Sequence, residues 1–182
     1  MIKGKIVVLL IMAISLAAIA NAVQDNIIMG PYKVSFDSGL KRGANYTVDN
    51  VTNMSGDSLD GYPESVYSAL LKNSTSAINA EIDIIYADSP LNSTSNSSSL
   101  KTLMESGLSG YWTTLRWNNR TIDKMPGELA ELKDSNGTQA YSAAYYLPNE
   151  NDTSVLIYSS WPWNTTTELL DTIHVERIAK AT

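Results

Sequence analysis

Residues 139–160, QAYSAAYYLPNENDTSVLIYSS, decide the fold class of this chain. Two segments rich in aromatic, small and β-branched residues, 139–147 and 154–160, flank a turn-like stretch that begins at Pro148. Segments of this composition separated by a short turn predict an antiparallel β-hairpin. We therefore expect the domain to be built on an antiparallel sheet.

Alternation of apolar and polar residues marks further strands around this hairpin. It occurs in 32–36 and in 80–86, where Glu81 and Asp83 lie on the polar side. Apolar residues at every second position are typical of a strand with one buried and one solvent-exposed face. Further strands are expected at 45–51, 64–71, 111–117 and 127–133.

Two helices are expected between and after the strands. In 100–108, leucines and a methionine recur at helical spacing after a serine run. The second helix is expected to begin at Thr165, where Thr-x-x-Glu168 matches a capping box, and to continue past Ile178 toward Lys180. The order predicts an α+β fold, an antiparallel β-sheet covered by a middle helix and a C-terminal helix.

The N-terminus has the organisation of a signal peptide. Lys3 and Lys5 precede the uncharged apolar run 6–20, and an Ala-Asn-Ala triplet ends at Ala22. The run is shorter than the roughly 20 residues that cross a bilayer. We therefore expect residues 1–22 to be a signal peptide.

Residues 23–182 are then expected to form a single α+β domain, since no repeat or linker divides them. Two alternatives remain for the leader: retention as a membrane anchor, or pilin-type cleavage after Gly4. Loss of the two leader lysines changes the formal charge from −6 to −8. An acidic chain without a basic cluster argues against a nucleic-acid partner.

The absence of cysteine excludes thiolate catalysis, redox motifs and cysteine-ligated zinc. His174 is the only histidine, so a Ser-His-Asp relay or a histidine-ligated metal would have to use it. Its expected place in the C-terminal helix predicts a packing or surface role instead. No cofactor is expected.

Ten of the fifteen asparagines lie in Asn-x-Ser/Thr triplets, which are acceptors for N-linked glycans. They are Asn45, Asn50, Asn53, Asn73, Asn92, Asn96, Asn119, Asn136, Asn151 and Asn164. Because glycan acceptors need exposed backbone, the triplets also predict surface positions along the whole mature chain. The alternative is a Ser/Thr/Asn-rich composition that produces the triplets by coincidence.

Five segments of the chain resemble a family of uncharacterised exported proteins of methanogenic archaea. They are 30–36, 120–127, 141–147, 159–163 and 169–176. The order of strand pair, helix, long meander and closing helix is also similar to PsbP/Mog1-like domains. These resemblances imply an archaeal envelope protein and a binding or assembly module, without catalytic residues to carry over.

Acidic residues supply the remaining candidates for chemistry. The loop 56–64, GDSLDGYPE, contains oxygen ligands suited to calcium, although its spacing differs from the EF-hand pattern. Asp123 with Glu128, or Glu131 with Asp134, could act as the acid and base of a glycoside hydrolase. Such pairs also arise by chance among nineteen acids.

Trp161 and Trp163 flank a proline ahead of the expected C-terminal helix and are candidates for stacking on a ligand. Trp112 and Trp117 are further aromatic candidates. We favour the alternative that the tryptophans belong to the core, because large rings pack at strand-to-helix junctions.

The sequence thus predicts an exported, N-glycosylated, non-catalytic protein, secreted or on the cell surface. Its expected role is that of a binding or assembly module of the envelope, with another envelope protein or a polysaccharide as partner. The alternatives are a carbohydrate-binding module that uses exposed tryptophans, a pilus-like structural subunit and a carboxylate-dependent hydrolase.

Overall fold

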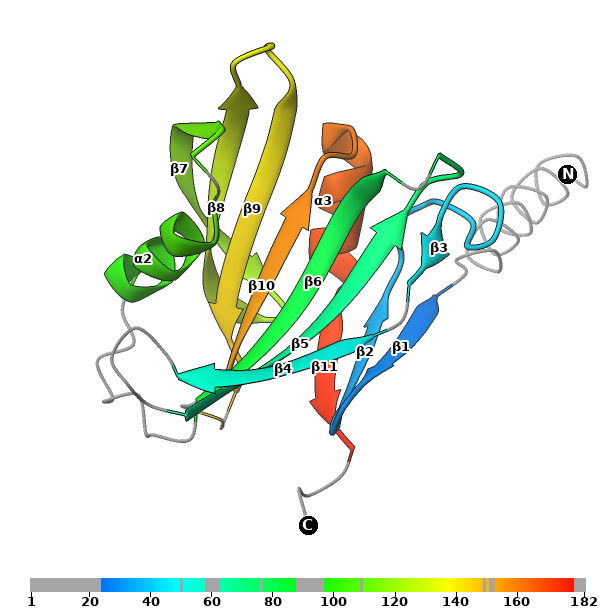
Figure 1. Cartoon of the computed structure of the whole chain (residues 1–182), viewed down its shortest axis with the longest axis vertical. Coiled ribbons are helices and arrows are strands. Elements are labelled where there is room, and N and C mark those ends of the chain that lie inside the picture. Colours follow the sequence, from blue (N-terminus) through cyan, green and yellow to red (C-terminus); the bar gives the residue numbers. More distant parts are fainter. Residues whose placement is uncertain are drawn as a thin grey trace, which may run out of the picture.

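The computed structural model describes residues 24–49, 51–57, 63–75, 77–87, 97–108, 110–148, 150 and 153–178. These residues form two antiparallel sheets and two helices (Figure 1).

The larger sheet has eight strands, and β10 lies at its centre, between β6 and β9. The strand bounds are β3 Thr47–Val48, β4 Thr52–Asp57, β5 Pro63–Lys72, β6 Ile78–Ala87, β7 Trp112–Ile122, β8 Met125–Asp134, β9 Gln139–Tyr146 and β10 Thr153–Ser159. From β9 the sheet continues through β8 to β7. On the other side β6 pairs with β5, which in turn pairs with both β3 and β4.

The smaller sheet has the order β1-β2-β11. Its strands are β1 Asp25–Met29, β2 Tyr32–Phe36 and β11 His174–Arg177. The helix α3, Trp163–Thr172, precedes β11, and α2, Ser97–Gly107, connects the β6 side of the larger sheet to β7. The smaller sheet and α3 lie on one side of the larger sheet, whereas α2 lies on the other (Figure 1).

The main core lies between the two sheets and beneath α3. Ile82 and Ile84 of β6 pair with Ile157 and Val155 of β10, and all four are buried in one cluster with Val34 of β2. The alternation in 32–36 and 80–86 therefore gives the inward faces that it predicts.

A second, smaller cluster lies beneath α2. Leu100 and Met104 of the helix pack on Ala130, Ala140 and Ala144 of β8 and β9. Alanines on a sheet allow a helix to approach closely, so α2 covers this part of the sheet.

The strand-rich α+β class and the hairpin of 139–147 with 154–160 are confirmed. The hairpin closes with Leu147 donating its N–H to the carbonyl of Thr153 at 3.0 Å. Of the expected strand 45–51, only Thr47–Val48 forms a strand, β3, and β4 begins after it at Thr52.

The prediction of a long C-terminal helix is wrong. α3 begins at Trp163, so Thr165 lies inside the helix and no side chain caps its start, where Pro162 is the N-cap residue. The helix ends at Thr172, because Ile173 and Val175 are buried while His174 and Glu176 are exposed. That two-residue period is satisfied by a strand, and β11 pairs with β2.

The hydroxyl of Thr172 fastens the end of α3 to Asp37, which directly follows β2. It accepts a hydrogen bond from the N–H of Asp37 at 2.8 Å and lies 2.7 Å from the Asp37 carbonyl oxygen. We predict that Thr172→Val lowers the free energy of unfolding by about 1 kcal/mol, since these bonds are lost while the side-chain shape is kept.

Urea unfolding measures this effect. Thr167→Val is the matched control, because the Thr167 hydroxyl donates only to backbone carbonyls in the first turn of α3 itself. Equal stability losses in the two variants would contradict the proposed role of the Asp37 contact.

Candidate functional site

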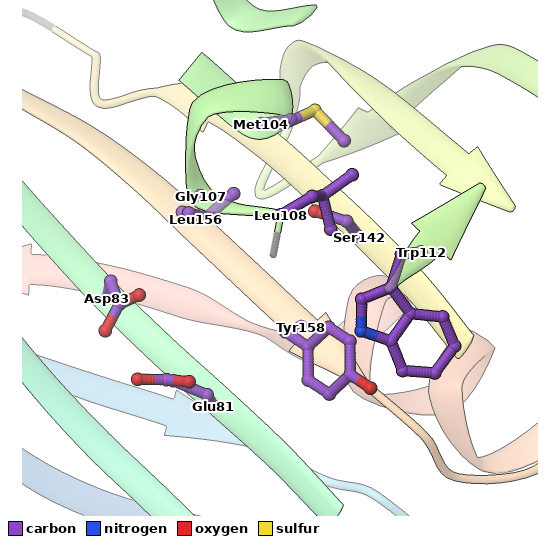
Figure 2. Close-up of a pocket in the computed structure, with 9 residues that line it drawn as sticks. All are labelled: Glu81, Asp83, Met104, Gly107, Leu108, Trp112, Ser142, Leu156 and Tyr158. Carbon is purple, nitrogen blue, oxygen red and sulfur yellow. The ribbon is translucent and has the colours of Figure 1, made fainter. Parts of the chain in front are cut away.

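A cleft of about 280 Å³ lies on the larger sheet beside α2. We call it the acidic–aromatic cleft; its lining residues are Glu81, Asp83, Met104, Gly107, Leu108, Trp112, Ser142, Leu156 and Tyr158 (Figure 2). It forms where α2 packs on β8 and β9, and among the described residues no helix covers the β6–β10 region of the same face. The lining residues come from five elements or their ends, so the tertiary fold assembles the cleft.

Strand alternation aims the side chains of β6 and β10 into the cleft. Ile82 and Ile84 face the main core, so Glu81 and Asp83 project from the opposite face of β6. In β10, Leu156 and Tyr158 likewise point away from the core. The packing that buries one face of these strands therefore places two carboxyl groups in the cleft.

Two aromatic rings form one wall of the cleft. The rings of Trp112, at the start of β7, and Tyr158 have centroids 5.8 Å apart with planes inclined by 60°. Figure 2 shows them side by side, with Leu108 and Ser142 nearby. Their apolar surfaces and the carboxyl groups of β6 thus share one cavity.

The carboxyl groups are held in a desolvated environment. Burial raises the pKa of Asp83 to about 7, opposed by a hydrogen bond that the Ser68 hydroxyl donates to it and reinforced by the charge of Glu81. Burial also raises the pKa of Glu81. No lysine, arginine or histidine lines the cleft in the described part of the chain. The cleft is therefore rich in acceptors, and Asp83 exchanges a proton near neutral pH.

No cluster of three or more potential metal-ligating side chains occurs among the described residues. Part of the loop 56–64, whose spacing differs from the EF-hand pattern, lies outside these residues.

The tryptophans proposed for ligand stacking lie in different environments. Trp161 is only 6% exposed and packs edge-to-face on Tyr46, with ring centroids 5.5 Å apart. It belongs to the main core and offers no face to a ligand, because the chain turns inward there before α3. Trp163 is 39% exposed and lies 4.9 Å from the ring of Tyr141.

His174 lies on β11 and not in a helix. Its Nδ1 is 2.7 Å from Oδ1 of Asp123, whose other oxygen accepts the N–H of Val175. Ser35 pairs with His174 across the strands, but its hydroxyl donates to Asn26. The histidine–aspartate pair therefore anchors the β7–β8 turn to β11, and no Ser-His-Asp relay is assembled.

In the carboxylate pairs suggested for hydrolysis, each carboxylate contacts a different structural partner. Glu128 lies 3.6 Å from Lys101, and Glu131 binds Arg116. Asp134 accepts backbone N–H groups within the β8–β9 turn. Asp123 holds His174, so each of the four carboxylates has its own structural contact.

Six of the ten glycan acceptors lie in the described residues. Five are exposed and Asn73 is half-buried; the exposed ones are Asn45, Asn53, Asn119, Asn136 and Asn164. Asn50, Asn92, Asn96 and Asn151 lie outside the described residues. Every described acceptor is therefore at least partly accessible.

No family model matches the chain, and no curated protein or solved structure matches it. Within the described residues, none of the helices has the length and apolarity to traverse a lipid bilayer.

The raised pKa of Asp83 predicts a pH-dependent stability. The folded state binds this proton more tightly than the unfolded chain, so the free energy of unfolding falls as the pH rises from about 4 to about 7. We predict that Asp83→Asn, which keeps the acceptor for Ser68, reduces this fall by up to about 4 kcal/mol.

Chemical unfolding at a series of pH values measures this difference. The control is Asp171→Asn, which alters an exposed carboxylate paired with Arg120. A pH profile of Asp83→Asn that coincides with that of the wild type would contradict the desolvation of Asp83.

Proposed function

We propose that the chain is an exported, N-glycosylated protein of the cell surface or its surroundings, and that it acts by binding a saccharide in the acidic–aromatic cleft. The observation that carries this proposal is the presence of two aromatic rings and two desolvated carboxyl groups in one cavity.

The cleft has the groups that recognise a neutral sugar or an amino sugar. The rings of Trp112 and Tyr158 suit the C–H face of a pyranose. Glu81, Asp83 and Ser142 accept hydrogen bonds from hydroxyl or amino groups. Since no cationic side chain lines the described cleft, acidic sugars and phosphates are poor ligands.

The proposed location of the protein, outside the cell or on its surface, is supported by the leader and by the accessible glycan acceptors. The leader predicts export, and the six described acceptors lie at accessible positions. The formal charge of −6 disfavours nucleic acid as partner. A polysaccharide or a glycosylated protein of the envelope is the partner that this surface and the cleft fit.

We also infer that the fold is related to PsbP/Mog1-like domains and that the chain belongs with exported proteins of methanogenic archaea. The strand pair, middle helix, meander and late helix support this inference. The strand β11, which follows α3, departs from the expected closing helix.

A second candidate function, glycoside hydrolysis, is favoured by the pKa of Asp83. A carboxyl group with a pKa of about 7 is suited to act as a general acid at neutral pH, and Glu81 supplies a second carboxyl group in the same cleft. Release of reducing sugar that is lost in both Asp83→Asn and Glu81→Gln would assign this activity to the cleft.

A binding titration tests the proposed function. Neutral, amino and acidic oligosaccharides are titrated into the full chain by calorimetry, and we predict that Trp112→Ala weakens binding of the neutral or amino class at least about tenfold, because it removes one stacking surface.

Trp163→Ala is the matched control, since it removes an exposed tryptophan outside the cleft. The proposal fails if no class of sugar binds, or if Trp163→Ala weakens binding as much as Trp112→Ala does.

A further inference from the structure

The larger sheet is bordered by β7 on one side and by β3 and β4, which both pair with β5, on the other. In the described part of the chain, β7 pairs only with β8, and β4 pairs only with β5. β7 has 11 residues and β4 has 6. An unpaired strand edge presents N–H and C=O groups to which a strand of another molecule can add.

Both edges also expose a large apolar side chain. Met54 of β4 is 57% exposed and Leu115 of β7 is 53% exposed. The register of β7 shifts at Leu115, and such an irregularity disturbs pairing only locally. The rest of each edge remains regular, so both strands have the features that promote association between sheets.

Each of these two strands contains a complete glycan acceptor triplet. Asn53 and Ser55 lie within β4, and Asn119 and Thr121 lie within β7. Strand alternation places the asparagine and its hydroxyl partner on the same face, and all four residues are exposed.

The distribution of acceptors follows the edges of the sheet. The inner strands β5, β6, β8, β9 and β10 contain no acceptor triplet. The other described acceptors lie before β3, in turns or in α3; they are Asn45, Asn73, Asn136 and Asn164. Within the described strands of the larger sheet, asparagine acceptors occur only in β4 and β7, which both lie at an edge.

We propose that N-linked oligosaccharides on Asn53 and Asn119 shield the two open edges of the larger sheet and keep the protein from joining other sheets edge to edge. A partner strand must approach to about 4.8 Å to pair. A branched, hydrated glycan attached within the edge strand projects from the face of the sheet, and its bulk beside the edge hinders the approach of such a strand. The edges of the smaller sheet, β1 and β11, have 5 and 4 residues, so they are much shorter than β7 with 11 and slightly shorter than β4 with 6.

This inference rests on the proposed N-glycosylation, so the experiment first measures site occupancy. The full chain is secreted from cells that carry out N-glycosylation, and peptide mass mapping gives the occupancy of each acceptor and the mature N-terminus, expected at Val23. We expect Asn53 and Asn119 to be glycosylated.

Size-exclusion chromatography with light scattering then compares variants. We expect the wild type to be monomeric and the double variant Asn53→Gln, Asn119→Gln to show at least roughly a doubling of the average molecular mass. Ser55→Ala with Thr121→Ala removes the same glycans but keeps both asparagines, and it should associate equally. Asn136→Gln, which removes an acceptor from the β8–β9 turn, should remain monomeric.

The outcomes separate the two proposals. Unmodified Asn53 and Asn119 beside glycosylated turn acceptors, or monomeric edge variants that have lost their glycans, would overturn edge shielding and leave the glycoprotein assignment standing. An intact mass equal to that of the bare polypeptide would overturn both.

Discussion

The structure depends on the apolar contact between the central strands β6 and β10 and the smaller sheet. Ile82 and Ile84 pair with Ile157 and Val155, and this strip is buried together with Val34 of β2. Because side chains alternate along a strand, burial of these residues leaves the opposite face of both strands outside the main core. The cleft is thus a consequence of the same strand register that builds the core. A one-residue slip in that register would move the core residues to the cleft face and the cleft residues to the core face.

The elements that the sequence predicts well are those whose signal is local. The β9–β10 hairpin combines favourable strand composition with a turn, and the leucines of 100–108 have helical spacing. The end of α3 is harder to predict, because Leu169, Leu170 and Ile173 fit a helical stripe. Pairing of β11 with β2 decides the conformation there, and that pairing joins segments more than 130 residues apart.

The cleft itself was largely beyond prediction. Alternation places Glu81 and Asp83 on the wet face of one strand, but the sequence does not indicate that Trp112 and Tyr158 lie beside them. Trp161 and Trp163 attract attention because they are close together in sequence, yet one is buried and the other packs on Tyr141. A half-buried carboxyl group without a cationic neighbour in the described cleft is visible only after folding, since partial burial is what raises the pKa of Asp83.

Sugar binding in the acidic–aromatic cleft is the function that we propose, and the chain contains four tryptophans that report on different places. Nuclear magnetic resonance of the indole N–H groups during titration with a neutral or amino oligosaccharide tests it directly. We predict that the resonance of Trp112 shifts while those of Trp161 and Trp163 stay unchanged, because only Trp112 lines the cleft. An unchanged Trp112 resonance, or a shift confined to Trp163, would contradict sugar binding in the acidic–aromatic cleft.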